Sequence, residues 1–359
     1  MQLRNLFLRF GLSAAIAGSA IHAVAQATDR RTTSRAISTS PFEFAHLINQ
    51  KPRKGSDIPA QVDLAPIWND LGIDAGGYNN CAGVCTAKLF RHELDGQPGL
   101  EVIVKLRGPI ELSRYLIFTR TRHAWRLLGF VDHDFNKYEE TRHRVARFDG
   151  RNWLVIRGQE GSGSGYALYG ETWYEVNDRG VRPVLSYPVQ GHTYAGTIGV
   201  GREFKARQLF TSGSSSKTNS VVLQYTATYT AFYYGAHDSS RVFINTHLAR
   251  YAWDENSHTF VFDRADSDIS EAEINGIANI QSEDASDSEA KIGNTAFYSN
   301  AKAFAGGGYE VFLKYNSAAL MKVATGNITQ PKEWLRRFLA ECDDTPEKIS
   351  LLSSLNRKP

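Results

Sequence analysis

Residues 142–157 read RHRVARFDGRNWLVIR, two short runs on either side of Asp149-Gly150. Asp-Gly between such runs is the strongest short-range signal for a β-hairpin, because both turn residues need a positive φ. A glycine- and serine-rich stretch follows at residues 161–165. We expect it to be a flexible loop, because it lacks the lysine and the glycine spacing of a phosphate-binding loop. The chain then returns in a further predicted strand at residues 167–176.

This pattern of short, aromatic-rich strands and glycine turns recurs from about residue 87 to residue 262. The chain of 359 residues contains 16 Tyr, 19 Phe and 6 Trp but only 2 Met, a bias that suits strands better than helices. Closely spaced strands with turns between them predict a mainly β fold. We expect an antiparallel multi-strand sandwich or a small propeller-like meander, with a helical C-terminal segment.

One piece of this region resembles a single FG-GAP-type repeat, in which an acidic glycine turn precedes a hydrophobic strand of a propeller blade. It consists of the turn at residues 95–99 and the strand at residues 100–106, where Leu100, Val102, Val104 and Leu106 share one face. The calcium-binding carboxylates of that family are absent, because Gln97 and Pro98 stand in their place. No metal site follows from the resemblance.

Composition changes after residue 262, and this change defines the predicted domains. Residues 263–295 are predicted to be an acidic linker, since Arg264 is the only basic residue among many acids up to residue 289. Residues 296–359 are predicted to be mixed but mostly helical. We expect a last strand at 308–315 and helices at 318–324, 331–342 and 346–355, with Pro331 and Pro346 at first helical positions.

The first 27 residues have the features of a cleavable secretory signal. Arg4 and Arg9 precede an alanine-rich apolar stretch at residues 11–25, and small residues follow with cleavage-site spacing. An uncleaved membrane anchor is the alternative, but the apolar stretch is shorter than the roughly 20 residues that a span needs. We therefore expect a periplasmic or secreted protein, with a polar N-terminal linker at residues 28–57 and the β domain at residues 58–262.

Charge and cysteine content narrow the function classes. Removing residues 1–27 takes two of the 41 basic residues and no acid, which leaves 39 basic residues against 38 acidic ones. The remaining sequence has no basic tract that would indicate nucleic-acid binding.

In an oxidising compartment, Cys81 and Cys85 are predicted to form a disulfide. Two unrelated thiols, or a redox or metal-binding pair, are the alternatives. Cys342 is the odd cysteine, expected to be buried on a helix.

Tyr169, Glu171, Trp173 and Glu175 alternate along one predicted strand and therefore project from one face. If that face is exposed, its aromatic rings and carboxylates could stack on a sugar and hydrogen-bond to it. A plain polar sheet surface is the alternative. Catalysis of glycoside hydrolysis is disfavoured, because positions four apart on a strand are about 13 Å apart at Cα, which is long for a catalytic carboxylate pair.

His123, His133 and His143 recur every ten residues, but even spacing along a meander does not require that they meet at a metal ion. We therefore expect no metal and no cofactor. The leading hypothesis is an exported, non-catalytic β-rich protein that binds a glycan or a protein partner. A hydrolase that uses Glu171 or Glu175 with one of these histidines is the first alternative, and a purely structural envelope protein is the second.

Overall fold

A computed structural model describes residues 36–50, 64–78, 85–108, 112–134, 140–163, 166–195, 200–209, 220–232, 239–270, 274 and 308–357. The predicted signal peptide, Cys81 and most of the predicted acidic linker lie outside these residues.

The chain begins with short elements and then enters a long run of strands. The first elements are β1 (Ala36–Ile37), α1 (Pro41–Ile48), α2 (Ala65–Leu71) and the 3-10 turn η1 (Gly76–Tyr78). The strands that follow are β2 (Thr86–His92), β3 (Glu101–Arg107), β4 (Leu112–Arg120), β5 (Trp125–Asp134), β6 (Arg142–Phe148), β7 (Arg151–Gly163), β8 (Tyr166–Asn177), β9 (Gly180–Ala195), β10 (Val200–Leu209), β11 (Ser220–Phe232), β12 (Ser239–Asp254) and β13 (Thr259–Phe262). Three helices close the chain: α5 (Gly308–Thr325), α6 (Thr329–Glu341) and α7 (Pro346–Asn356).

The strands form two antiparallel sheets. The smaller sheet has five strands in the order β1-β5-β4-β3-β2, and the larger has eight in the order β13-β12-β11-β10-β9-β8-β7-β6. The Asp-Gly hairpin predicted from the sequence joins β6 to β7, and Asp149 and Gly150 have φ values of 52° and 69°. The prediction of a mainly β, antiparallel sandwich with a helical C-terminal segment is confirmed.

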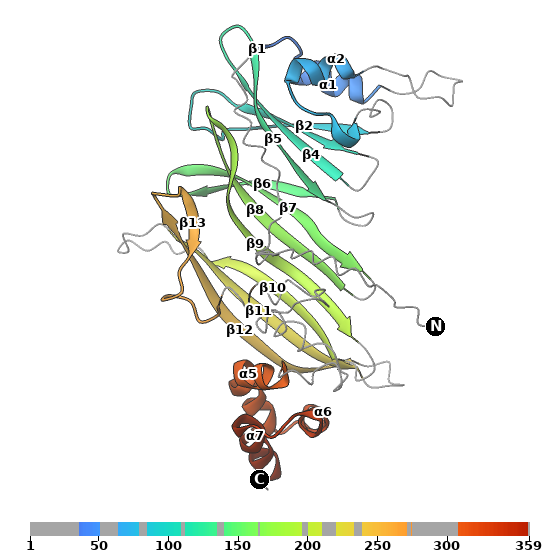
Figure 1. Cartoon of the computed structure of the whole chain (residues 1–359), viewed down its shortest axis with the longest axis vertical. Coiled ribbons are helices and arrows are strands. Elements are labelled where there is room, and N and C mark those ends of the chain that lie inside the picture. The colour runs from blue at the N-terminus through green and yellow to red at the C-terminus, as the bar shows by residue number, and fades with distance from the viewer. Residues whose placement is uncertain are drawn as a thin grey trace, which may run out of the picture.

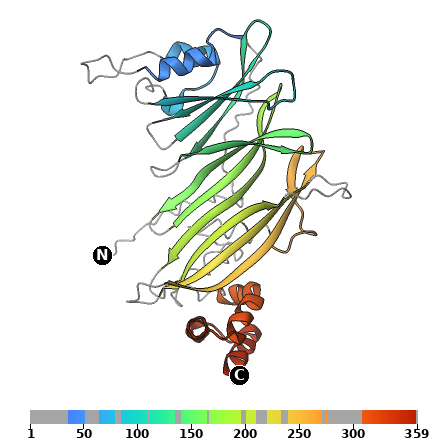
Figure 2. The same ribbon diagram turned by 180° about the vertical axis from the view of Figure 1, so that it is seen from behind.

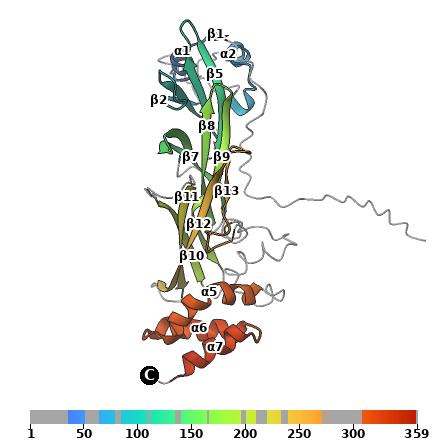
Figure 3. The ribbon, with the colours of Figure 1, turned by 90° about the vertical axis from the view of Figure 1, so that its left-hand side faces the viewer.

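The two sheets and the N-terminal helices are stacked in layers. One face of the smaller sheet packs on α1 and α2, around Phe44, Ile48 and Trp68. Its other face packs on β7 and β8 of the larger sheet, where Ile117 and Leu154 are fully buried. The helices, the smaller sheet and the larger sheet follow one another along the long axis of the molecule, as the views in Figures 1 and 3 show.

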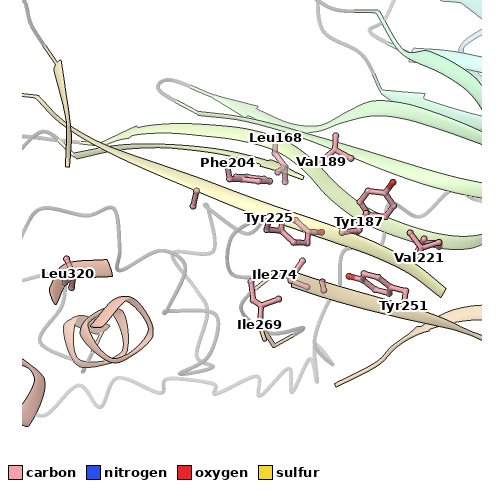
Figure 4. Close-up of a cluster of buried hydrophobic side chains, with 14 of the residues drawn as sticks. Leu168, Tyr187, Val189, Phe204, Val221, Tyr225, Tyr251, Ile269, Ile274 and Leu320 are labelled. Carbon is pink, nitrogen blue, oxygen red and sulfur yellow. The ribbon is translucent and has the colours of Figure 1, made fainter. Parts of the chain in front are cut away.

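The larger sheet curls until its two ends meet. Trp253 of β12 lies 5.4 Å from Trp153 of β7 between ring centroids, and Phe260 of β13 lies 5.7 Å from Trp153 and 6.0 Å from Trp173. The same curled face continues along β8–β12 as a second group of buried side chains, with Ile269 and Ile274 beside Tyr225 (Figure 4). Both faces of β7 and β8 are therefore buried.

The C-terminal helices stand at the end of the molecule opposite α1 and α2 (Figure 2). The predicted strand at residues 308–315 is wrong, because these residues begin α5. Leu313, Leu320 and Ala324 are buried, and their spacings of seven and four residues are those of one face of a helix. The predicted strand covered only eight residues, which is too short to reveal this period. Thr345 caps α7 by accepting a hydrogen bond from the Lys348 amide, so Pro346 stands at the first helical position as predicted.

Two further segments differ from the sequence-based description. The predicted loop at residues 161–165 is strand up to Gly163, which pairs with Tyr166 across the β7–β8 hairpin. Residues 36–48, within the predicted polar linker, pair with β5 and pack on the smaller sheet. Asn49, after α1, exchanges two hydrogen bonds with the backbone of Ala87, at 2.8 Å and 2.9 Å. Its side-chain amide thus covers part of the outer edge of β2.

Candidate ligand-binding site

A cleft opens where two strands of the larger sheet separate. β9 and β10 pair from Ala195 opposite Val200 as far as Gln190 opposite Lys205. Beyond that pair, β9 continues alongside β8 and β10 continues alongside β11. The cleft that results has a volume of about 250 Å³. Its size lies just below the roughly 300–1,000 Å³ range of small-molecule sites, so it suits one small polar group.

Five strands contribute side chains to the cleft. Gln190, Tyr187 and Val189 come from β9, and Lys205, Ala206 and Gln208 come from β10. The remaining lining residues are Arg144 of β6, Arg157 of β7 and Glu171 of β8. Arg157, Glu171 and Tyr187 are directly paired across three neighbouring strands, and this pairing places them in one row.

Glu171 is held by a chain of hydrogen bonds. Its Oε2 accepts from Arg144 Nη2 at 2.9 Å and from the Tyr187 hydroxyl at 2.9 Å. The Tyr187 hydroxyl in turn accepts from Trp173 Nε1 at 3.3 Å. Burial, and then the neighbouring Glu171 carboxylate, raise the pKa of Tyr187, so this hydroxyl keeps its proton and donates. The carboxylate therefore has a fixed orientation at the wall of the cleft.

Arg157 is positioned by a ring and an amide. Its guanidinium carbon lies 5.3 Å from the centre of the Tyr169 ring, and its Nη2 donates to Gln190 Oε1 at 2.9 Å. A planar guanidinium held in this way has a defined orientation. Arg144 lies over the Trp173 ring at 5.8 Å. Both arginines therefore have one side fixed by an aromatic side chain.

The four residues predicted to form one exposed row occupy different environments. Glu171 lines the cleft, and Tyr169 supports Arg157 beside it. Trp173 is fully buried, so the expectation that it is exposed is wrong. The reason is that β8 has a packed layer on each face, whereas the prediction assumed one solvated face. Glu175 lies further along the strand and accepts a hydrogen bond from Arg182 Nε at 2.6 Å.

Glu160 is a largely buried carboxyl in the same sheet. It is the extra residue of a β-bulge, because Gln159 pairs with Tyr169 and Gly161 pairs with Leu168. Its side chain lies over Gly170, where an added Cβ would be 1.6 Å from Oε1. Oε2 has no hydrogen-bond partner within the part of the chain that the structure describes. Burial raises the pKa of Glu160 to about 7.

The structure does not bring the three evenly spaced histidines together. His133 is buried between the two sheets and its Nε2 lies 2.8 Å from the Tyr174 hydroxyl, and burial lowers its pKa to about 4. His143 lies on the same side of the larger sheet, with its Nε2 3.3 Å from that of His92. His123 is exposed in the turn before β5. The hydrolase hypothesis needs one of them beside Glu171 or Glu175, and none lines the described part of the cleft.

The described residues also bear on the expected metal, cysteine and membrane features. No group of three or more potential metal ligands occurs among the described residues. Cys85 is disulfide-bonded, whereas Cys342 is buried and is not part of a disulfide. Cys81 lies outside the described ranges, so its pairing with Cys85 stays a prediction. Within the described segments, no helix combines the length and the apolar character needed to cross a membrane.

Sequence reasoning missed most of the residues that line the cleft. Arg144 and Arg157 lie at either side of the apolar part of the β6–β7 hairpin. Their alternation onto the inward face of the hairpin is the signal that could have identified them. Tyr187, Gln190 and Lys205 carry no local signal, because they meet only where β9 and β10 diverge.

Comparison with known proteins gives no relative. No protein-family model matches the chain, no curated protein matches it, and no solved structure matches it.

Proposed function

We propose that this protein is an exported, non-catalytic binding protein, and that its ligand is a glycan, one small polar part of which is held in the cleft between β9 and β10. The observation behind this proposal is the lining of the cleft. Arg144, Arg157, Gln190 and Gln208 offer several hydrogen-bond donors and acceptors, and Glu171 offers a fixed carboxylate. Such groups match the adjacent hydroxyls of a sugar, and Tyr187 adds an aromatic wall.

Export is supported by two independent features. The N-terminal 27 residues have the basic start, apolar stretch and small-residue ending of a secretory signal. Cys85 is disulfide-bonded, as is typical of proteins that fold in an oxidising compartment. N-terminal sequencing of protein from the periplasm and from the culture medium tests the proposed cleavage. An intact N-terminus in both fractions would contradict it.

Binding is tested with glycan arrays and titration calorimetry on the mature protein. Gln208→Ala removes one polar group from the cleft and should weaken sugar binding by about threefold to tenfold, the cost of one hydrogen bond. Gln224→Ala is the matched control, because Gln224 lies on β11 opposite Arg207, outside the cleft lining. Absence of sugar binding, or equal losses in both variants, would reject the glycan proposal and leave a protein partner or a structural role.

A further inference from the structure

We infer that the tip of the smaller sheet docks on the surface of a membrane that contains anionic lipid. The tip consists of Phe42 on α1, Arg91 on β2, and residues 119–126, which span the turn between β4 and β5. It is separate from the cleft, whose lining residues belong to the larger sheet. The inference therefore adds a second contact surface to the proposed function and does not depend on it.

Two arginines and two aromatic rings form one stack at the tip. The guanidinium carbon of Arg91 lies 5.1 Å from the centre of the Phe42 ring, and the Phe42 and Trp125 rings meet edge to face with centroids 5.8 Å apart. Arg120 is paired with Trp125 across the β4–β5 hairpin, and its guanidinium carbon lies 5.7 Å from the centre of the Trp125 ring. Because these residues come from four different elements, the fold itself assembles the stack.

The tip carries positive charge that the described part of the protein does not neutralise. The turn reads TRTRHAWR, with three arginines and no acid. Glu43 is the only acidic residue in α1, β2 and this turn. Arg91, Arg120 and Arg122 are all exposed, and none of them forms an ion pair within the residues that the structure describes. Their guanidinium groups therefore attract an anionic surface.

Exposed apolar side chains beside these arginines favour a membrane over a soluble anionic polymer. Phe42 is 36% exposed, and Leu89, two positions before Arg91 on the same face of β2, is 39% exposed. A soluble acidic polymer needs only the guanidinium groups, whereas the headgroup region of a membrane accepts aromatic rings as well. The tip lies at the end of the molecule that carries α1 and α2, so its side chains can reach a flat surface together (Figure 1).

Co-sedimentation with lipid vesicles tests the inference on the mature chain, residues 28–359. One set of vesicles is phosphatidylcholine alone, and the other contains equal parts of phosphatidylcholine and phosphatidylglycerol. We expect the protein to bind the mixed vesicles at least about tenfold more tightly than the neutral ones, and to bind them less tightly as the salt concentration rises. Equal binding to both sets, or no binding to either, would overturn the inference.

An arginine variant and a matched control separate the tip from the charge of the whole protein. Arg122→Gln should weaken binding to the mixed vesicles by about fivefold, the effect of one arginine near an anionic surface. Arg337→Gln is the control, because Arg337 is also exposed but lies on α6, at the opposite end of the molecule (Figure 2). Equal losses in the two variants would show a general charge effect and reject the tip as the docking site.

Phe42→Ala tests whether the rings enter the headgroup region. Burial of the exposed part of this side chain, about a third of it, corresponds to about twofold to fivefold in binding, so the variant should lose that much affinity for the mixed vesicles. Circular dichroism of each variant checks that its fold is unchanged. A loss in Arg122→Gln without a loss in Phe42→Ala would assign the tip to a soluble anionic polymer and reject membrane docking.

Discussion

Replacing Glu160 with glutamine should change how the stability of this protein depends on pH. In the folded state, burial raises the pKa of the Glu160 carboxyl from 4.5 to about 7. In the unfolded chain the same carboxyl ionises near 4.5, so between these values the folded state holds a proton that the unfolded state has lost. The contribution of Glu160 to stability is therefore present below pH 4.5 and is lost as the pH rises toward 7.

The size of the effect follows from the difference between the two pKa values. At about 1.4 kcal/mol per pH unit, a rise from 4.5 to about 7 corresponds to about 3 kcal/mol of unfolding free energy. Glutamine has the shape of the protonated carboxyl and does not titrate. The stability of Glu160→Gln relative to wild type should therefore increase by about 3 kcal/mol between pH 4 and pH 8.

Urea unfolding at a series of pH values measures this difference. Tryptophan fluorescence reports on the relevant region, because Trp153, Trp173 and Trp253 all lie in or against the core of the larger sheet. Glu255→Gln is the control, since Glu255 is exposed in the β12–β13 turn and its replacement should leave the wild-type profile unchanged. Parallel profiles for Glu160→Gln and wild type would refute the buried, unpartnered state of this carboxyl.

Three further changes have defined outcomes. Asn49→Ala removes two hydrogen bonds to Ala87 and should lower the unfolding free energy by about 1–3 kcal/mol in urea. Burial lowers the pKa of His133 from 6.5 to about 4. Between these two pH values the unfolded state binds a proton at this residue and the folded state does not, so the unfolding free energy falls as the pH drops from 6.5 to 4. His133→Gln should reduce that loss by about 3 kcal/mol in acid unfolding followed by circular dichroism. Trp173→Ala should lower the unfolding free energy in urea by about 3–5 kcal/mol, because Trp173 is fully buried. It should also weaken the binding of any ligand in the cleft, because Trp173 donates a hydrogen bond to Tyr187.

Each of these outcomes has a result that contradicts it. An unchanged urea midpoint for Asn49→Ala would mean that its amide does not stabilise the edge of β2. An acid-unfolding curve for His133→Gln that matches wild type would mean that this imidazole is not shielded from protons. Loss of less than about 1 kcal/mol for Trp173→Ala would place its ring at a surface, where truncation leaves no cavity.

Local sequence pattern predicted the strands well and their surroundings poorly. The alternation in β3 correctly placed Val102, Val104 and Leu106 on one packed face. The opposite face holds Ile103, which is fully buried against the larger sheet. A period of two identifies a strand and separates its faces, but it does not report how many layers will cover them.

The same limit applies to the candidate site. Glu171 was identified because it alternates with other residues on one strand. Its partner Tyr187 comes from the neighbouring strand β9 and its partner Arg144 from β6, two strands away, and Lys205 lies across the gap that β9 and β10 leave. Strand separation is a property of the whole curled sheet, so no window of sequence around Lys205 could have revealed the cleft.

The contact between Trp153 and the pair Trp253 and Phe260 has a consequence for how the molecule is made. These rings come from strands about a hundred residues apart, and long-range contacts of this kind form late and slowly. During synthesis, β7 exists well before the rings that cover it. Until β13 has emerged, Trp153 is an exposed apolar surface, and the nascent chain needs a chaperone or rapid completion to avoid aggregation.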